Sequence, residues 1–226
     1  MRALARDMAQ RLFDAIKAGD LGKVRAILKA DPGLANARGP DGVPAVVVAL
    51  YFGRKDIADE ILAYKPTLDI HAAATVGDLG RMRQLVEKDP ASVHAYSSDG
   101  FPPLGLAAYM GHDDVVACLL SKGADVNQIG KNPAKFTALT GAVAARHPKL
   151  AKRLLEAGAD PNYWYEGGYT PVLEAAAHGD IPMLELLVLH GGDVTAETVQ
   201  GTTAVALALE NKHPEAADWL KSHGAK

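Results

Sequence analysis

The chain has 226 residues, of which 48% are hydrophobic and 23% are charged, and its formal net charge at pH 7 is −3. This composition is typical of a folded globular protein and not of a disordered chain. The acidic balance, without a basic cluster, predicts no nucleic-acid partner. The longest apolar run, Val43 to Phe52, has ten residues, too few to cross a bilayer, so we expect no membrane partner.

The N-terminal segment MRALARDMAQRLF does not resemble a secretory signal, because Asp7 and Gln10 interrupt the place of its apolar region. The single cysteine, Cys118, cannot form an internal disulfide and lies in the apolar segment VVACLL, which predicts a buried hydrophobic side chain. We therefore expect a cytoplasmic protein.

Glycine and proline are frequent, at 22 and 13 residues, and the stretches between them are rich in alanine and leucine. This pattern predicts short helices separated by many turns. Many turns between short helices are typical of chains built from internal repeats.

The first half of the chain repeats irregularly. The segment AGDLGKVRAILKADPGLANARGPDG (residues 18–42) recurs 58 residues later as VGDLGRMRQLVEKDPASVHAYSSDG. Gly19, Gly53, Gly77 and Gly111 mark predicted turns spaced by 34, 24 and 34 residues. The 58-residue shift therefore contains two units, and the second lacks its loop between Ile61 and Ala72. We expect the stack of units to bend at that junction.

The second half keeps a regular period. The segments GADVN, GADPN and GGDVT begin at residues 123, 158 and 191, which are 35 and 33 residues apart. The pairs Pro103-Leu104, Ala138-Leu139, Pro171-Val172 and Ala204-Val205 keep the same phase. A third marker is the turn Gly111-His112, which recurs as Arg146-His147, Gly179-Asp180 and Lys212-His213.

These markers together resemble the ankyrin repeat, which has a 33-residue period and a T-P-L-H-x-A stretch. The copies FPPLGLAAYMGHDDVVACLLSKGADVN (101–127) and YTPVLEAAAHGDIPMLELLVLHGGDVT (169–195) match best. The resemblance implies one all-α domain over residues 1–226, a solenoid of helix-turn-helix units with short hairpin loops. We predict seven repeats, with the first and last as caps: 7–38, 39–67, 68–96, 97–131, 132–164, 165–197 and 198–226.

The repeat markers have physical roles. A Thr170 hydroxyl before Pro171 can cap the first helix of a repeat, and Thr137 is a weaker version of that cap. Small residues let neighbouring first helices approach closely, and leucine pairs form the buried side of the second helices. The small residues are Ala107, Ala108, Ala175, Ala176 and Ala206, and the leucine pairs are 119–120, 154–155 and 186–187.

None of the eight histidines shows catalytic or metal-ligand spacing. We expect His112, His147 and His213 to form structural hydrogen bonds at turns, and His71 to do so at the T-P-L-H position. His178 is the one histidine that the repeat phase places on the inner face. We predict no catalytic residue, no metal and no cofactor, and hence no enzyme.

The resemblance implies a protein partner, because ankyrin repeats use their hairpin tips and inner helix ends as a concave binding face. Ten of the thirteen aromatic residues fall at such positions. Large rings gathered on one surface are typical of interface hot spots. The predicted partner-binding residues are Tyr51, Phe52, Tyr96, Phe101, Tyr109, Met110, Phe136, Tyr163, Trp164, Tyr165, Tyr169 and His178.

Several alternatives stay open at this point. About half of these rings could pack one hairpin against the next and bind nothing. The favoured function is a non-catalytic protein-interaction module, and the alternative is an accessory or inhibitory protein that regulates a partner enzyme. A small-ligand binder or enzyme would instead need a deep polar pocket. The chain could be a monomer or a weak homo-oligomer.

Overall fold

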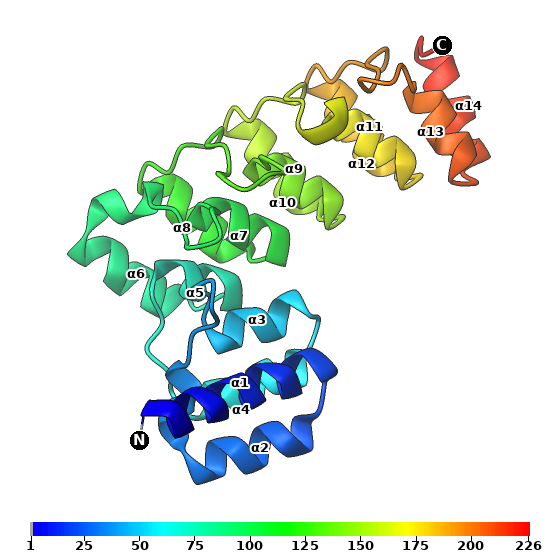
Figure 1. The fold of residues 1–226 in the computed structure, drawn as a ribbon. Helices are drawn as coiled ribbons and strands as arrows, with labels where there is room; N and C mark the ends of the chain where they lie inside the picture. The colour runs from blue at the N-terminus through cyan, green and yellow to red at the C-terminus, as the bar shows by residue number, and fades with distance from the viewer. Residues whose placement is uncertain (1) are drawn as a thin grey trace.

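The computed structural model describes the backbone of residues 2–226 and the side chains of residues 7–226. Its fourteen α-helices follow one another as helix pairs along an arc from the N-terminus to the C-terminus (Figure 1). Within the described residues, the only β features are isolated bridges, Arg38–Pro44 and Glu197–Thr203. The predicted all-α repeat architecture is confirmed, while the exact repeat boundaries stay a prediction.

The first helices of the pairs, the inner helices, are α1 (Arg2–Ala18), α3 (Ala45–Tyr51), α5 (Ile70–Val76), α7 (Pro103–Met110), α9 (Ala138–Ala144), α11 (Pro171–Ala177) and α13 (Ala204–Glu210). The second helices, the outer helices, are α2 (Leu21–Ala30), α4 (Lys55–Ala63), α6 (Leu79–Lys88), α8 (Asp113–Ser121), α10 (Pro148–Glu156), α12 (Ile181–Leu189) and α14 (Pro214–Ser222). Three 3-10 helices lie in the connecting loops: η1 (Pro32–Asn36), η2 (Pro90–His94) and η3 (Glu166–Gly168).

Side-chain caps begin many of these short helices. The Thr170 hydroxyl accepts a hydrogen bond from the Leu173 amide at 3.3 Å, as predicted. Thr137 does more than predicted, because it forms a reciprocal capping box with Thr140. Helices of seven to nine residues are marginal alone, so the caps and the packing between pairs hold them in place.

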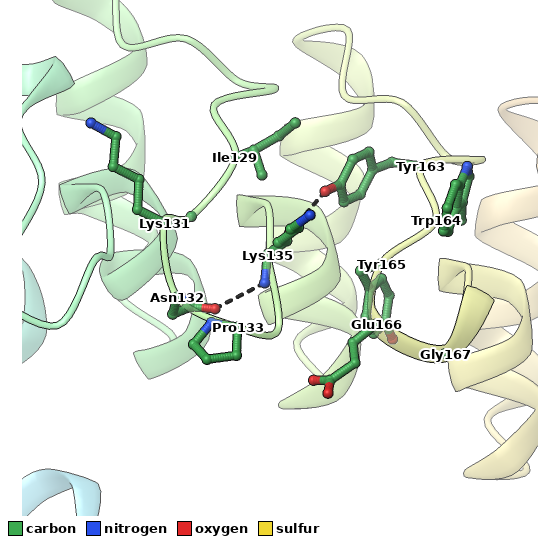
Figure 2. A pocket seen from close by; sticks show the side chains of 11 residues that line it. Ile129, Lys131, Asn132, Pro133, Lys135, Tyr163, Trp164, Tyr165, Glu166 and Gly167 are labelled. Atoms are coloured by element: carbon green, nitrogen blue, oxygen red, sulfur yellow. Dashed lines mark hydrogen bonds between the residues drawn. The ribbon is translucent and has the colours of Figure 1, made fainter.

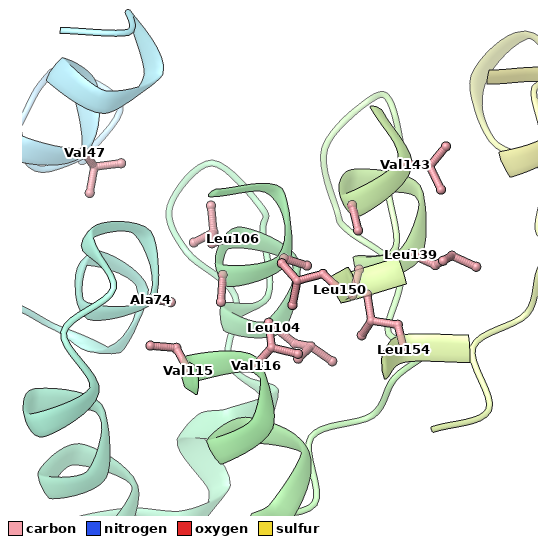
Figure 3. Packing of buried hydrophobic residues seen from close by; sticks show 14 of the residues in the cluster. Val47, Ala74, Leu104, Leu106, Val115, Val116, Leu139, Val143, Leu150 and Leu154 are labelled. Atoms are coloured by element: carbon pink, nitrogen blue, oxygen red, sulfur yellow. The ribbon is translucent and has the colours of Figure 1, made fainter. Parts of the chain in front are cut away.

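The core is a continuous layer of alanine, valine and leucine between successive pairs (Figure 3). Ala107, Ala108, Ala175 and Ala176 are fully buried in the inner helices, as predicted. Ala206 is half-buried, and Ala208, two residues further along α13, is fully buried. Among the predicted leucine pairs and other apolar residues of the outer helices, Leu119, Leu154, Leu187 and Cys118 are buried.

A second contact joins the pairs at their turns. The turn residues all have positive φ, and they are Gly19, Gly53, Gly77, Gly111, Arg146, Gly179 and Lys212. At most junctions, the residue immediately before the outer helix of the following pair packs against this turn. The His112 Nε2–H donates to the Thr75 carbonyl at 2.9 Å, and a Cβ on Gly77 would lie 2.5 Å from His112 Nδ1. Arg146 makes the same contact as an ion pair, with Nε 3.2 Å from Asp180 Oδ2. We call this the turn contact.

The turn contact is missing at the junction between the second and third pairs. A Cβ on Gly53 would meet no atom within 4 Å. The connection from α4 to α5 is also short, residues 64–69, whereas that from α2 to α3 is residues 31–44. The outer helix α2 packs on α4, α6 on α8, and α10 on both α8 and α12, whereas α4 and α6 make little contact, as do α12 and α14.

The opposite side of this junction is closed. Because the third pair has no projecting loop before it, the loop before α3 meets the loop before α7. Tyr51 Oη donates to Asp99 Oδ2 at 2.9 Å, and a Cβ on Gly42 would lie 3.1 Å from Ser98 Cβ. The stack therefore closes on its loop side and opens on its turn side, the irregularity that the 24-residue spacing predicted.

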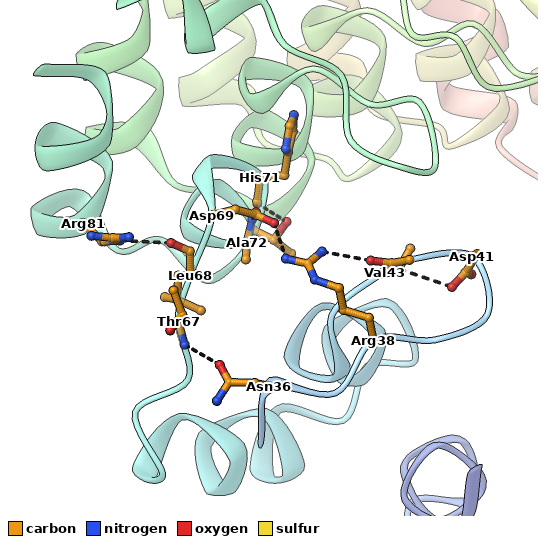
Figure 4. Close-up of polar contacts among 12 residues, drawn as sticks. Asn36, Arg38, Asp41, Val43, Thr67, Leu68, Asp69, His71, Ala72 and Arg81 are labelled. Carbon is orange, nitrogen blue, oxygen red and sulfur yellow. Dashed lines mark hydrogen bonds and ion pairs between the residues drawn. The ribbon is translucent and has the colours of Figure 1, made fainter. Parts of the chain in front are cut away.

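Polar contacts bridge the short connection (Figure 4). Arg38 donates to Asp69 Oδ2 at 2.7 Å and to the Gly42 carbonyl at 2.9 Å, and Asn36 Oδ1 accepts from the Thr67 amide at 2.7 Å. Burial alone would raise the pKa of Asp69, but hydrogen bonds from the Ala72 amide and Arg38 hold the pKa below its ordinary value. Asp69 thus caps α5 and, through Arg38, links it to the loop before α3.

The turn contact at Gly77 predicts a larger cost for substitution than the positive φ alone. Gly123, which has a φ of +84° but no atom within 4 Å, is the control, and we expect Gly123→Ala to lower the free energy of unfolding by about 1–2 kcal/mol because that φ is strained for alanine. Gly77→Ala should cost about 1–3 kcal/mol more, since its methyl group would strike His112. Denaturant unfolding measures both. Equal costs for the two variants would contradict a tight turn contact.

An ion pair between outer helices predicts a pH effect. Asp113 lies 2.7 Å from Arg153 Nε and 2.9 Å from Lys149 Nζ, and hydrogen bonds from these groups lower its pKa to about 2. Its stabilising contribution is therefore complete above the ordinary value of 3.8 and is lost as the pH falls through about 2. A carbon-13 NMR titration should show this pKa rising in Arg153→Gln and staying low in Lys152→Gln, which changes a residue paired with Glu156. An unchanged pKa in Arg153→Gln would refute the pairing.

Candidate functional site

The loops that precede the inner helices project as a row of tips. Neighbouring tips are joined by single backbone hydrogen bonds, from the Lys131 amide to the Gly100 carbonyl at 2.8 Å and from the Val199 amide to the Gly167 carbonyl at 3.0 Å. The approach is close enough to require glycine, since a Cβ on Gly168 would lie 2.7 Å from the Val199 amide nitrogen.

One neighbouring pair of tips is not joined in this way. The connection from α8 to α9 is residues 122–137, two residues longer than the connections 157–170 and 190–203. In the part of the chain that the structure describes, no backbone hydrogen bond links residues 129–136 to residues 163–168. A hollow of about 780 Å³ lies between these segments (Figure 2). We call it the tip hollow.

Ring contacts close the base of the tip hollow. Tyr163 Oη donates to the Lys135 carbonyl at 2.9 Å, and Phe136 meets Tyr165 edge to face with centroids 5.2 Å apart. Tyr165 is only 6% exposed and donates to Glu174 Oε2 at 2.8 Å; burial, followed by the Glu174 charge, raises its pKa. The prediction that Tyr165 presents its ring to a partner is wrong, because that ring is part of the interior.

Other predicted rings also pack loop against loop. Tyr96 Oη donates to the Ile129 carbonyl at 2.9 Å, and Lys131 Nζ lies 4.1 Å from the Tyr96 ring centroid. Phe101 and Tyr169 are half-buried against the core. The alternative role, hairpin-to-hairpin packing, is therefore what these residues do in the free chain.

Four predicted aromatic residues remain well exposed. Trp164 is 65% exposed, Tyr109 50%, Phe52 49% and Tyr51 40%. Trp164 stands at the rim of the tip hollow, while the other three lie at the ends of inner helices α3 and α7. Met110, beside Tyr109, is half-buried.

Two exposed residues on the tips were not predicted. Ile129 is 43% exposed on the wall of the tip hollow, and Val199 is 67% exposed on the last tip. A search restricted to aromatic residues could not find them. The 35-residue spacing among 33-residue spacings was the available signal for the tip hollow itself, because it places two extra residues in that loop.

Of the four histidines predicted to form structural hydrogen bonds, His71, His112 and His147 do so, whereas the His213 ring lies against Gly179 and forms no side-chain hydrogen bond in the described residues. His147 Nε2–H donates to the Tyr109 carbonyl at 3.1 Å, and His71 Nε2–H to the Ala95 carbonyl at 3.2 Å. Burial lowers the pKa of His71. His178 ends α11 with Nε2 3.5 Å from Glu174 Oε1, and its buried Nδ1 has no hydrogen-bond partner in the described residues.

The tip hollow is suited to contact with a polypeptide. It is open, its lining combines aromatic rings with the Ile129 side chain, and Lys135 and Glu166 also line it. Such a surface offers aromatic rings for stacking, together with hydrogen-bond donors and acceptors. Among the described residues we find no helix with the length and hydrophobicity of a transmembrane span.

Known proteins share the repeat pattern of this chain. The family model for ankyrin repeats (3 copies) matches residues 70–165 and 139–226. An ankyrin repeat-containing protein of Treponema pallidum is 35% identical over 48% of this chain and 36% of its own length. A transient receptor potential cation channel subfamily A member 1 homolog of Caenorhabditis elegans is 31% identical over 66% of this chain and 12% of its own length. Mouse ankyrin repeat and SAM domain-containing protein 6 is 33% identical over 45% and 11%.

The chain thus spans about a third or less of the length of these relatives. The likeness lies in the repeats, which are generally protein–protein interaction modules. Because the family model covers more than half of the residues and the helix pairs, turns and tips follow its pattern, the chain belongs to the ankyrin-repeat family.

Proposed function

We propose that this chain is a non-catalytic protein-interaction module that binds a partner protein at the tip hollow, with Trp164 as its anchor. A single buried free thiol, Cys118, suits the reducing cytoplasm, which is the compartment that we propose.

The observation that carries the proposal is the place of Trp164. This ring is 65% exposed and stands where the backbone link between tips is missing. Tryptophan is among the residues most enriched in interface hot spots, and exposing it to water costs free energy that a partner would recover. A partner segment entering the tip hollow would meet Trp164 and Ile129 together.

The remaining exposed rings extend this surface along the inner helix ends. Tyr109 lies at the end of α7, and its helix packs directly on α9, the helix behind the tip hollow. A partner that fills the tip hollow and continues toward the N-terminal pairs would reach Tyr109 and then Phe52. The exposed rings at the ends of α7 and α3 therefore support one continuous binding face.

Affinity capture with quantitative mass spectrometry tests this site. Trp164→Ala should reduce recovery of the specific partner by at least about tenfold, since hot-spot truncations cost 2 kcal/mol or more. Leu189→Ala is the matched control, because Leu189 is 80% exposed on an outer helix and its truncation should leave recovery unchanged.

Circular dichroism must show the same helix content and thermal midpoint for both variants. Equal recovery with Trp164→Ala and the unmodified chain would rule out the tip hollow as the binding site. Equal losses with Trp164→Ala and Leu189→Ala would show that the effect is not specific to this face.

A further inference from the structure

A second hollow lies where the loop before α3 meets the loop before α7. It has a volume of about 240 Å³, and its walls include Phe13, Asp41, Tyr51, Phe52 and Asp99. We call it the junction hollow. It exists because the connection 64–69 is too short to project a loop between these two tips.

The junction hollow carries two carboxylates without a cationic partner. Asp99 accepts hydrogen bonds from Tyr51 Oη at 2.9 Å and from Ser97 Oγ at 2.5 Å, and Asp41 Oδ1 accepts from the Val43 amide at 3.3 Å. In the described part of the chain neither carboxylate is in an ion pair.

The other charges nearby do not neutralise these groups. Arg38 donates its hydrogen bonds to Asp69 Oδ2 and to the Gly42 carbonyl instead. Lys17 lies on the rim from α1, is exposed and forms no ion pair in the described residues. Burial, and then the charges of Asp99 and Asp41, raise the pKa of Tyr51, so both carboxylates act on the same ring.

Two exposed rings stand beside these carboxylates. Tyr51 is 40% exposed and Phe52 49% exposed. A guanidinium group can stack on an aromatic face while its edge donates to a carboxylate, which an ammonium group does less well. The volume is smaller than the roughly 300–1,000 Å³ of small-molecule sites, so it fits one inserted side chain better than a free ligand.

We propose that the junction hollow receives an arginine side chain of the partner protein, stacked on Tyr51 or Phe52 and paired with Asp41 and Asp99. The proposal rests on the proposed function only in that the arginine belongs to a protein partner. It adds a charged contact at the N-terminal end of the face, far along the stack from Trp164.

NMR spectroscopy of the full-length, nitrogen-15-labelled chain tests the proposal with peptides. The probe is the blocked pentapeptide Gly-Ser-Arg-Ser-Gly, and its two controls carry citrulline or lysine in place of arginine. The amides of residues 39–43 and 97–100 should shift with the arginine peptide. Binding should weaken about tenfold with citrulline, which keeps the shape and loses the charge, and by a smaller factor with lysine.

Variants separate binding from folding. Asp41→Asn should weaken the arginine peptide about threefold, while Glu185→Gln, an equal charge change on the outer helix α12, should leave binding unchanged. Tyr51→Phe keeps the ring and frees Asp99 from a competing donor, so binding should be kept or strengthened. Lys17→Gln should strengthen binding, because it removes the rim cation.

Several results would overturn the proposal. Equal shifts with the arginine and citrulline peptides would exclude recognition of charge, and equal binding of lysine would exclude stacking. Loss of binding in Tyr51→Phe would show that the Tyr51 hydroxyl, and not the released Asp99 carboxylate, contacts the arginine. If the peptide fails to bind while Trp164→Ala still abolishes partner capture, this inference fails and the proposed function stands.

Discussion

The contact between each turn and the next outer helix determines how the helix pairs stack. At most junctions a turn residue with positive φ lies against a side chain from the following pair, as Gly77 does against His112. Glycine allows the ring to approach, and Arg146 replaces the same contact by an ion pair with Asp180. At Gly53 the contact is missing, and the short connection 64–69 brings the loops before α3 and α7 together on the opposite side.

Loop length sets the other side of each junction. Loops of equal length, residues 157–170 and 190–203, place their tips within one hydrogen bond of each other, as Val199 and Gly167 show. A connection shortened to residues 64–69 brings non-adjacent tips together and forms the junction hollow, while one lengthened to residues 122–137 separates neighbouring tips and forms the tip hollow. Both candidate binding features therefore arise at departures from the period, which agrees with the rule that repeat proteins vary their function at loops on one face.

The period made much of the fold predictable, because a turn needs a residue that tolerates positive φ and a short helix needs a cap. Gly111, Gly179 and Thr170 are predictable on that basis, and the 24-residue spacing marks the junction where the turn contact is missing. The orientation of individual rings was not predictable. Tyr163, Trp164 and Tyr165 are adjacent, yet Trp164 faces solvent and Tyr165 is buried, because successive side chains of an extended segment point in opposite directions. Which of the three is buried depends on Glu174, a partner nine residues away.

The central claim is that the partner binds where the row of tips is interrupted. Hydrogen–deuterium exchange of the free and partner-bound chain tests it most directly, since a bound segment shields the backbone that it covers. The account predicts slower exchange in residues 129–136 and 163–168 on binding, with the outer helices α8, α10 and α12 unchanged. Protection confined to those outer helices, with no change at the tips, would contradict it.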